Sequence, residues 1–142
     1  MEQKTTGNGV YAVYAYDAAD RLLPVLLASR AGDEVAAVHA GWRGLAGGIL
    51  EASLQRGGFA PEHTLAWLGP GIGAVVYEIG EEVREAFLQQ SMHDESAFAP
   101  SVNGRWYMDM YRLARQRLNA AGVQQIYGGE YCTYTQRELF FS

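Results

Sequence analysis

The chain has 142 residues, of which 49% are hydrophobic and 19% charged, and its formal net charge is −5. This size and composition fit one globular domain with its own core and exclude a disordered chain. Because Lys and Arg are not clustered and no long apolar stretch or signal sequence is present, we exclude nucleic-acid and membrane binding and expect a soluble, cytoplasmic protein. The single cysteine excludes an internal disulfide.

The first part of the chain predicts a flexible start followed by strands. Residues 1–9 are mostly polar, and we expect them to be flexible. The apolar stretches Val10–Tyr16 and Leu22–Ala28 predict strands. Ser29–Glu34, with a Gly-Asp pair at its centre, predicts a turn. Val35–Val38 follows without polar alternation, which is typical of a strand that is covered on both faces.

The middle of the chain predicts helices on either side of a short strand. A helix is expected from just after Gly44 to about Arg56, where a pair of glycines ends it. Thr64–Leu68 predicts a strand that runs parallel to the preceding one and completes a right-handed β-α-β unit. A further helix is expected from Glu81 to about Gln90, because acidic residues in a first turn suit the helix dipole.

The last part of the chain predicts a hairpin, a capped helix and further strands. Asn103–Gly104 lies between two apolar segments and predicts a two-residue hairpin turn. Asp109 is the expected N-cap of a helix over Met110–Ala121. Val123–Tyr127 and Leu139–Phe141 predict strands.

These elements predict the fold class. Strands outnumber helices, and the two kinds of element do not alternate strictly along the chain. We therefore predict an α/β (α+β) fold, in which a mixed-sheet sandwich core is flanked by about three helices. Residues 10–142 form a single domain in this prediction.

The segment Val35–Gly44, with the sequence VAAVHAGWRG, carries the clearest chemical signal. His39 follows the expected buried strand, and Arg43 lies between two glycines at the start of the expected helix. Strand ends in α/β proteins often bind ligands, and a helix start combined with a guanidinium favours anions. A neutral imidazole serves as a metal ligand or a general base near neutral pH. These residues alone explain His39 equally well as a hydrogen-bonded core residue.

Several segments resemble the laccase-domain family, whose members are also described as multicopper polyphenol oxidoreductases and purine nucleoside phosphorylases. HAGWRG resembles the family's signature, and GPGIGAVVYEIG (Gly69–Gly80) is similar to its glycine-rich loop. DMYRLARQRLNAAGV (Asp109–Val123) resembles its Asp-capped helix, while CTYT (Cys132–Thr135) and LFFS (Leu139–Ser142) resemble its closing segment. The matches keep their order from about Val35 to the end, and the chain thus resembles the family's C-terminal half.

The resemblance implies a zinc-dependent enzyme that acts on purine nucleosides and phosphate and also deaminates adenosine. In the family, the histidine of HAGWRG, here His39, is one of three zinc ligands. The other two are a cysteine in an ADCLPVL-type segment and a histidine much earlier in the chain. Here the cysteine position falls on Leu22 or Ala18, depending on the alignment, and the earlier histidine has no counterpart. We therefore expect two of the three ligands to be absent, together with the family's N-terminal half.

The expected site combines a catalytic pair with substrate-binding residues. His39 and Arg43 are the catalytic candidates, His39 also as the metal ligand and Arg43 as the anion-binding group. Substrate or anion contacts are expected from four residues: Trp42, Gly44, Gly71 and Tyr77. An aromatic ring stacks on a base or a phenol, and glycines let a ligand approach the backbone. The structural alternatives are a core role for the Trp42 ring and tight turns for the glycines.

The remaining metal-binding side chains do not complete a site in the sequence. His63 and His93 lie in polar segments, and we expect them to be exposed. Asp17 and Asp20 lie near the missing cysteine, but carboxylates with one histidine form a weak zinc site. Cys132 is expected to be a buried structural thiol, because no histidine is adjacent in sequence to activate it.

Three functions therefore remain open. The first is zinc-dependent chemistry on a purine nucleoside and phosphate. The second is copper-dependent oxidation of phenolic small molecules, although three histidines and one cysteine are few donors for a multicopper site. The third is an inactive family member without a metal, which forms a homodimer to cover an exposed apolar surface.

Overall fold

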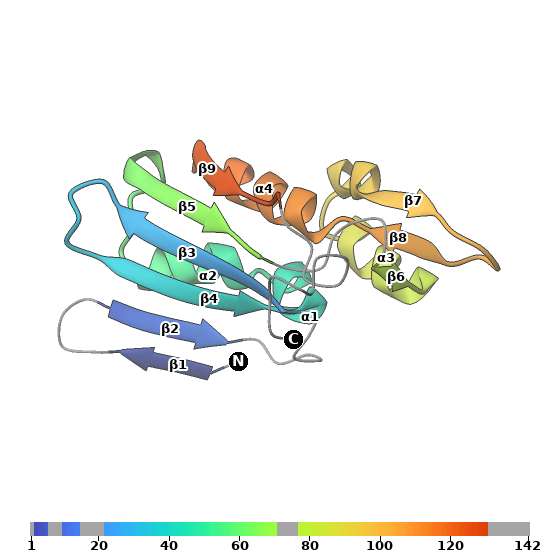
Figure 1. The fold of residues 1–142 in the computed structure, drawn as a ribbon, viewed down its shortest axis with the longest axis horizontal. Coiled ribbons are helices and arrows are strands. Elements are labelled where there is room, and N and C mark those ends of the chain that lie inside the picture. The colour runs from blue at the N-terminus through green and yellow to red at the C-terminus, as the bar shows by residue number, and fades with distance from the viewer. Residues whose placement is uncertain (1, 6–9, 15–21, 71–76, 131–142) are drawn as a thin grey trace.

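A computed structural model describes residues 2–5, 10–14, 22–70 and 77–130 (Figure 1). Within these residues, six strands form a main sheet in the order β1-β2-β4-β3-β5-β9. Their bounds are β1 Glu2–Thr5, β2 Val10–Tyr14, β3 Leu23–Ser29, β4 Val35–Ala40, β5 Thr64–Leu68 and β9 Gln125–Gly128. The pairs β2–β4 and β5–β9 are parallel and the others antiparallel. The mixed sheet predicted from the sequence is confirmed.

A smaller sheet and the helices complete the described part of the chain. The small sheet has the order β6-β8-β7, with bounds β6 Glu78–Ile79, β7 Phe98–Pro100 and β8 Trp106–Met108. The helices are α1 Trp42–Ala46, α2 Ile49–Arg56, α3 Glu81–Leu88 and α4 Met110–Ala120, with 3-10 helices η2 Pro61–His63 and η3 Met92–Ala97. Figure 1 shows α1, α2 and α4 behind the main sheet and α3 beside the small one. No helix in the described ranges is long and apolar enough to cross a membrane.

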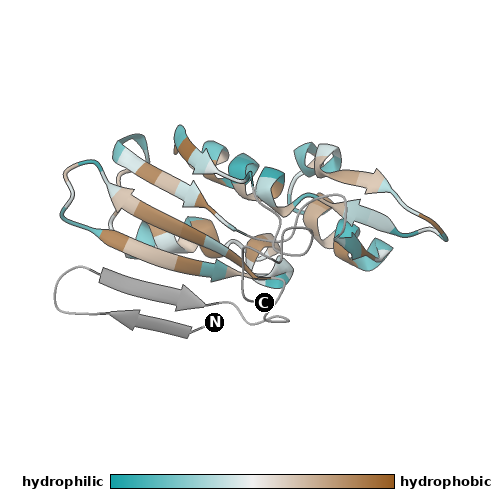
Figure 2. Cartoon of the chain, viewed as in Figure 1, coloured by the Kyte–Doolittle hydropathy of each residue, from teal (hydrophilic) through white to brown (hydrophobic). Residues whose placement is uncertain are grey.

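The main sheet buries one face against α1, α2 and α4, and its other face stays open in the described structure. On β3, Val25 and Leu27 are at most 1% exposed, whereas Leu26 between them is 53% exposed. Ala36 and Val38 of β4 are buried in the same way, but Val35 is exposed. The expectation that this strand is covered on both faces was therefore wrong. Its uninterrupted apolar run arises because the open face is also apolar, as the brown colouring of β3 and β4 shows (Figure 2).

The prediction of a single helix from just after Gly44 to about Arg56 was wrong at the start of the helix and in its middle. The first helix begins at Trp42, and Gly47 and Gly48 separate it from α2. Gly48 has a φ of +90°, a left-handed conformation that interrupts a helix and that glycine adopts without strain. Periodicity alone missed this interruption, because the apolar spacing continues from α1 into α2.

The hairpin and the capped helix are confirmed. Asn103 and Gly104 have φ angles of 56° and 73°, and the Arg105 amide donates to the Val102 carbonyl at 3.1 Å, as in a hairpin turn with two left-handed residues. The Asp109 carboxylate accepts a hydrogen bond of 3.0 Å from an amide in the first turn of α4. The helix expected from Glu81 is also present, as α3.

One sequence expectation differs from the arrangement of the strands, and a second is confirmed. Residues 1–9 were expected to be flexible, yet Glu2–Thr5 forms β1, because pairing with β2 gives its backbone hydrogen-bond partners at the sheet edge. The strands β4 and β5 run in the same direction, as expected, but β3 lies between them. The strand expected at Leu139–Phe141 lies outside the described residues.

The left-handed glycines give a test of the fold. Gly128 has a φ of +87°, and a Cβ placed there would lie 2.2 Å from the Leu68 carbonyl oxygen. Gly104 has a φ of +73°, and a Cβ there would meet nothing within 4 Å. We predict that Gly104→Ala lowers the free energy of unfolding by about 1–2 kcal/mol through backbone strain alone. Gly128→Ala should cost roughly a further 1–3 kcal/mol, because the backbone must move apart. Urea denaturation of both variants checks this, and equal losses would contradict the close approach.

Candidate functional site

The carboxyl ends of four strands meet at one edge of the main sheet. The strands β2, β4, β5 and β9 all run in the same direction, so their carboxyl ends lie together beside the start of β3. The register pairs Leu23 of β3 with Ala40, and Val25 with Leu68, whose other partner is Gly128. This edge is where α/β folds bind ligands, because the strand ends leave loops and helix starts free to surround a molecule.

His39 lies near this edge, but it belongs to the strand rather than following it. In β4, Ala36, Val38 and Ala40 are buried toward the helices, and His39 lies on the opposite, open face with its backbone paired to Pro24. Its side chain is half-buried. The residue is therefore neither a deep core histidine nor a fully solvated one, and its imidazole lies at the rim of the open face.

A short helix start holds Arg43 at the surface next to this strand end. Gly41 is buried and extended, and its carbonyl accepts a hydrogen bond of 3.0 Å from the Leu45 amide. Leu45 is fully buried and ties α1 to the core. Arg43 is exposed, and its guanidinium carbon lies 4.7 Å from the centre of the half-buried Trp42 ring. This cation–π contact places the positive charge over one face of the indole and leaves the rest of Trp42 packed on the core.

The neighbouring strand ends approach each other closely through glycines. The Gly69 amide donates to the Pro24 carbonyl at 2.8 Å, and the Gly129 amide donates to the Leu68 carbonyl at 3.0 Å. Gly69 has a φ of +103°, and a Cβ there would lie 3.0 Å from the Tyr111 hydroxyl. The glycines at this edge therefore permit tight backbone packing, which supports the structural alternative for this part of the predicted loop.

Of the other predicted contact residues, the structure places Tyr77 in the core and Gly44 within α1. Tyr77 is 1% exposed and packs in the core, and its carbonyl accepts a hydrogen bond of 2.8 Å from the Met108 amide. Gly44 lies within α1 and is half-buried. Gly71 lies outside the described residues. Of the substrate-binding set, the structure thus brings Trp42 and Gly44 close to Arg43 along α1.

The described residues do not assemble a metal centre. No group of three or more His, Cys, Asp or Glu that could hold a metal occurs within residues 2–5, 10–14, 22–70 and 77–130. His63 and His93 are exposed, as expected, at the end of η2 and in η3. Asp17, Asp20 and Cys132 lie outside the described residues.

Two charged side chains near the sheet and the helices were missed by sequence reasoning. Arg115 on α4 donates to the Ile126 carbonyl at 3.3 Å and to the Gly128 carbonyl at 2.6 Å, and so fixes the carboxyl end of β9. Asp94 in η3 is 2% exposed and pairs with Arg117 of α4 at 2.7 Å. Burial raises the pKa of the Asp94 carboxyl, while the charges of Arg117 and His93 lower that pKa to a smaller extent. No local pattern indicates these contacts, because the partners of Arg115 and Asp94 are distant in sequence.

Comparison with known proteins places the whole arrangement in a family. Residues 6–142 match the family model described as multi-copper polyphenol oxidoreductase laccase. The chain is 53% identical over 120 residues to the purine nucleoside phosphorylase YfiH of Shigella flexneri, which covers 84% of this chain and 49% of that protein. It is 50% identical over 121 residues to a purine nucleoside phosphorylase of Pseudomonas aeruginosa, and this match covers 84% of the present chain and 50% of that protein. The chain thus spans about half the length of the curated relatives it matches.

Solved structures agree with the sequence matches. A crystal structure of a Neisseria meningitidis protein superposes with a TM-score of 0.81 at 42% identity, over 83% of this chain and 49% of that one. The structure of YlmD from Geobacillus stearothermophilus gives a TM-score of 0.75 at 31% identity. The match covers 86% of this chain and 48% of that one. The signature segment, the sheet and the glycine-rich strand ends therefore have one common explanation: the chain belongs to the multi-copper polyphenol oxidoreductase laccase family.

Proposed function

We propose that the chain acts in the phosphorolysis of purine nucleosides at the carboxyl edge of the main sheet. The observation that carries this proposal is the placement of His39, Trp42 and Arg43 at one strand end, in a chain whose relatives are named purine nucleoside phosphorylases. In this reaction, phosphate attacks C1′ of the ribose, the bond from C1′ to the purine breaks, and a free purine and ribose 1-phosphate form. The cytoplasmic location expected from the sequence is part of the proposal.

Arg43 is the phosphate-binding residue in this proposal. Its guanidinium is exposed and is held over the Trp42 ring at 4.7 Å, so it is oriented before a ligand arrives. A guanidinium offers a planar fork of donors that matches two oxygens of a phosphate. Trp42 supports this group and packs on the core, and we assign it a positioning role rather than a stacking role, because Arg43 covers one of its faces.

His39 is the proton-transfer residue in this proposal. Its half-buried imidazole lies at the rim of the open face, and an imidazole exchanges protons near neutral pH. A departing purine gains a proton as the bond to C1′ breaks, and His39 is suited to supply it. The alternative role expected from the sequence, as a ligand of zinc, stays a prediction that the metal content of the purified chain tests.

The described donor set fits neither a zinc site nor a multicopper site. Zinc sites use about three or four His, Cys or carboxylate ligands, and a multicopper site uses more. The described residues contain no group of three such side chains, so no step is assigned to a metal. Phenol oxidation needs redox-active copper, whereas the transfer of the ribosyl group from the purine to phosphate needs no oxidant or reductant. For this reason, nucleoside phosphorolysis is favoured over polyphenol oxidation.

Variants of Arg43 test the assignment of the phosphate site. Arg43→Ala should raise the KM for phosphate by about 10–100-fold, because a charge-assisted hydrogen bond is lost. Arg43→Lys should give a smaller increase, since an ammonium keeps the charge but loses the fork. Arg30→Ala, at an exposed arginine that follows the far end of β3, is the matched control and should leave the KM unchanged. An unchanged KM in Arg43→Ala would contradict the assignment.

Variants of the histidines test the assignment of His39 as the proton-transfer residue. His39→Ala should lower kcat for inosine at least about 100-fold, the range expected when a proton-transfer group is removed. His63→Ala removes an exposed imidazole at the amino end of β5 and serves as the control. Steady-state rates with both variants check this, and undiminished turnover in His39→Ala would show that the imidazole has no part in the reaction.

A second proposal concerns assembly, because the open sheet face favours a homodimer. Leu26 and Trp67 are each 53% exposed and pair across β3 and β5, and Tyr127, 50% exposed, pairs with Trp67 in register. The Trp67 and Tyr127 rings stack with centroids 6.4 Å apart. No Asp, Glu, Lys or Arg lies on the described parts of β3, β4, β5 and β9. Two copies of an acidic chain therefore meet there without like-charge repulsion, and sheets pack well face to face.

Sedimentation tests the homodimer. The chain should sediment as a dimer, and Trp67→Lys, which places a charge at the centre of the open face, should shift it to a monomer. Val102→Lys is the matched control, because Val102 is 67% exposed but follows β7 in the small hairpin. A monomeric wild-type chain that binds no apolar-surface dye would contradict this proposal.

A further inference from the structure

Two residues on one face of α4 hold the end of β9 at the carboxyl edge of the main sheet. Tyr111 and Arg115 are four residues apart, so their side chains leave the helix on the same face. The guanidinium of Arg115 donates to the Ile126 carbonyl at 3.3 Å and to the Gly128 carbonyl at 2.6 Å. Gly129 packs against both side chains, because a Cβ placed there would lie 3.3 Å from Cδ1 of Tyr111 and 3.5 Å from Nη2 of Arg115.

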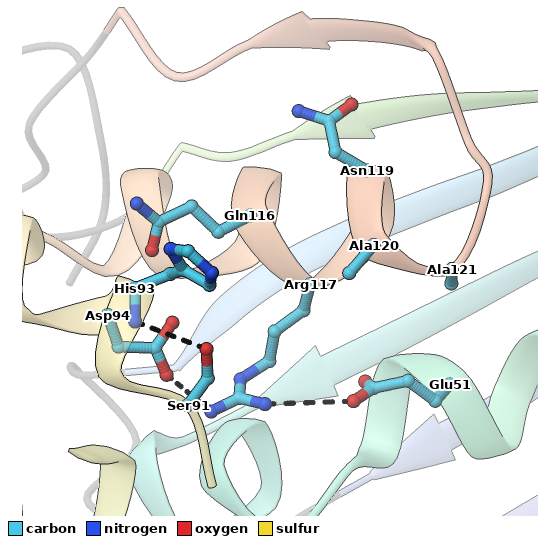
Figure 3. A pocket seen from close by; sticks show the side chains of 9 residues that line it. All are labelled: Glu51, Ser91, His93, Asp94, Gln116, Arg117, Asn119, Ala120 and Ala121. Carbon is cyan, nitrogen blue, oxygen red and sulfur yellow. Dashed lines mark hydrogen bonds and ion pairs between the residues drawn. The ribbon is translucent and has the colours of Figure 1, made fainter.

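A buried ion pair anchors another face of α4. Arg117 lies about 200° around the helix from Arg115. The side chains of Arg117 and Asp94 are 10% and 3% exposed, and Nη2 of Arg117 lies 2.7 Å from Oδ2 of Asp94. Arg117 also lines a pocket of about 380 Å³ between α2, η3 and α4, where Figure 3 shows it reaching between Asp94 and Glu51.

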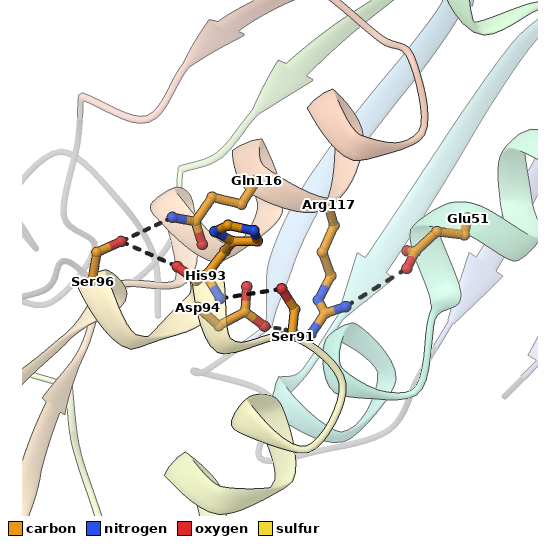
Figure 4. Close-up of polar contacts among 7 residues, drawn as sticks. All are labelled: Glu51, Ser91, His93, Asp94, Ser96, Gln116 and Arg117. Carbon is orange, nitrogen blue, oxygen red and sulfur yellow. Dashed lines mark hydrogen bonds and ion pairs between the residues drawn. The ribbon is translucent and has the colours of Figure 1, made fainter.

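A hydrogen bond adds a second link between α4 and η3. The side-chain nitrogen of Gln116 donates to Oγ of Ser96 at 3.0 Å (Figure 4). Together with the ion pair, this bond ties α4 to η3, and the side chains of α4 that reach the strand ends therefore start from an anchored helix.

From the Gly128 carbonyl, two peptide groups continue as a hydrogen-bonded chain over the ends of β9, β5 and β3. The peptide group that follows Gly128 accepts from Arg115 through its carbonyl, and its amide donates to the Leu68 carbonyl at 3.0 Å. The peptide group that follows Leu68 donates in turn, through the Gly69 amide, to the Pro24 carbonyl at 2.8 Å. Hydrogen bonds in such a chain polarise one another, and a charged donor at its start makes the first bond a strong one.

The last acceptor of this chain belongs to a direct neighbour of His39. Pro24 and His39 are register partners on β3 and β4. The Pro24 carbonyl accepts from Gly69, which follows β5, so it points away from β4. Pro24 and His39 therefore form a pair without a hydrogen bond between them, the kind of antiparallel pair in which the side chains lie closer together. Both side chains are half-buried on the open face of the sheet.

We propose that Arg115 is a positioning residue for His39, an inference that rests on the proposed function. Arg115 holds the Gly128 carbonyl, the hydrogen-bonded chain carries this constraint to Pro24, and Pro24 limits the orientations of the neighbouring imidazole. The imidazole is thereby held in the orientation from which it transfers a proton, and such orientation contributes to the rate of a reaction.

The phosphate-binding residue is held by other contacts. Arg43 belongs to α1, which buried Leu45 ties to the core, and its guanidinium lies over the Trp42 ring. None of these contacts involves Arg115. Loss of the Arg115 guanidinium should therefore disturb the step that depends on His39 and spare the binding of phosphate.

NMR of the imidazole groups tests the proposal without a need for turnover. The chain has three histidines, and the variant His39→Ala identifies the signals of His39. Arg115→Ala should shift these signals and leave those of the other two histidines in place. Arg112→Ala is the matched control, because this exposed arginine of the same helix donates to Ser96 of η3 at 3.1 Å, and it should leave the His39 signals unchanged.

Two results of this comparison would overturn the proposal. One is that the His39 signals do not move in Arg115→Ala, and the other is that they move equally in Arg112→Ala. If Arg115→Ala fails to fold, Arg115→Lys takes its place, because an ammonium lacks the fork that holds two carbonyls. The lysine variant should shift the His39 signals as well, and unmoved signals would again overturn the proposal.

Steady-state kinetics give the second readout. Arg115→Ala should lower kcat for inosine about tenfold, as expected when a proton-transfer group loses its orientation, and should leave the KM for phosphate unchanged. Arg112→Ala should change neither constant. An unchanged kcat in Arg115→Ala, or an equal loss in the control, would overturn the proposal. If the wild-type chain does not cleave inosine, the proposed function fails, and the NMR comparison still decides whether Arg115 positions His39.

Discussion

The burial of one face of the main sheet against α1, α2 and α4 is the constraint on which the rest of the structure depends. Strand residues alternate between the two faces, so the positions of Val25, Val38 and Ala66 in the core place their neighbours on the open face. Burial of a Val or Leu side chain contributes about 1.5–3 kcal/mol, and slipping one strand by a residue would exchange its core and open faces. The register of the sheet, and with it the place of His39, follows from this core.

The same core fixes the candidate site. A helix of five residues has no stability of its own, and α1 exists because Leu45 is fully buried beneath it. Arg43 is thus held at the strand end by packing at a neighbouring residue, and its charge is oriented by the Trp42 ring. At the same edge, Arg115 ties α4 to the end of β9 through two carbonyls. Apolar packing at Leu45 and the hydrogen bonds of Arg115 to backbone carbonyls therefore hold this edge from both sides.

Local signals in the sequence predicted most of the elements, and long-range pairing explains what they missed. The Asn103–Gly104 turn and the Asp109 cap were predictable because turn and cap chemistry acts within a few residues. The break at Gly48 was missed because apolar spacing continues across it. The insertion of β3 between β4 and β5 was missed because strand order is set by contacts that no local pattern encodes.

The candidate site was predictable to the same limited extent. HAGWRG indicated His39 and Arg43, since a polar cluster after an apolar strand is a local pattern. The core position of Tyr77 was not predictable, because a tyrosine after a glycine-rich segment suits a site and a core equally well. The pocket around Arg117 joins residues from α2, η3 and α4, and only the folded chain brings them together.

The most direct test of the proposed function is the identity of the product that the wild-type chain forms from inosine in the presence of inorganic phosphate. Phosphorolysis at the edge that carries His39 and Arg43 predicts hypoxanthine and ribose 1-phosphate in equal amounts, with no reaction when phosphate is left out. Free ribose, or no cleavage of inosine at any phosphate concentration, would contradict the account.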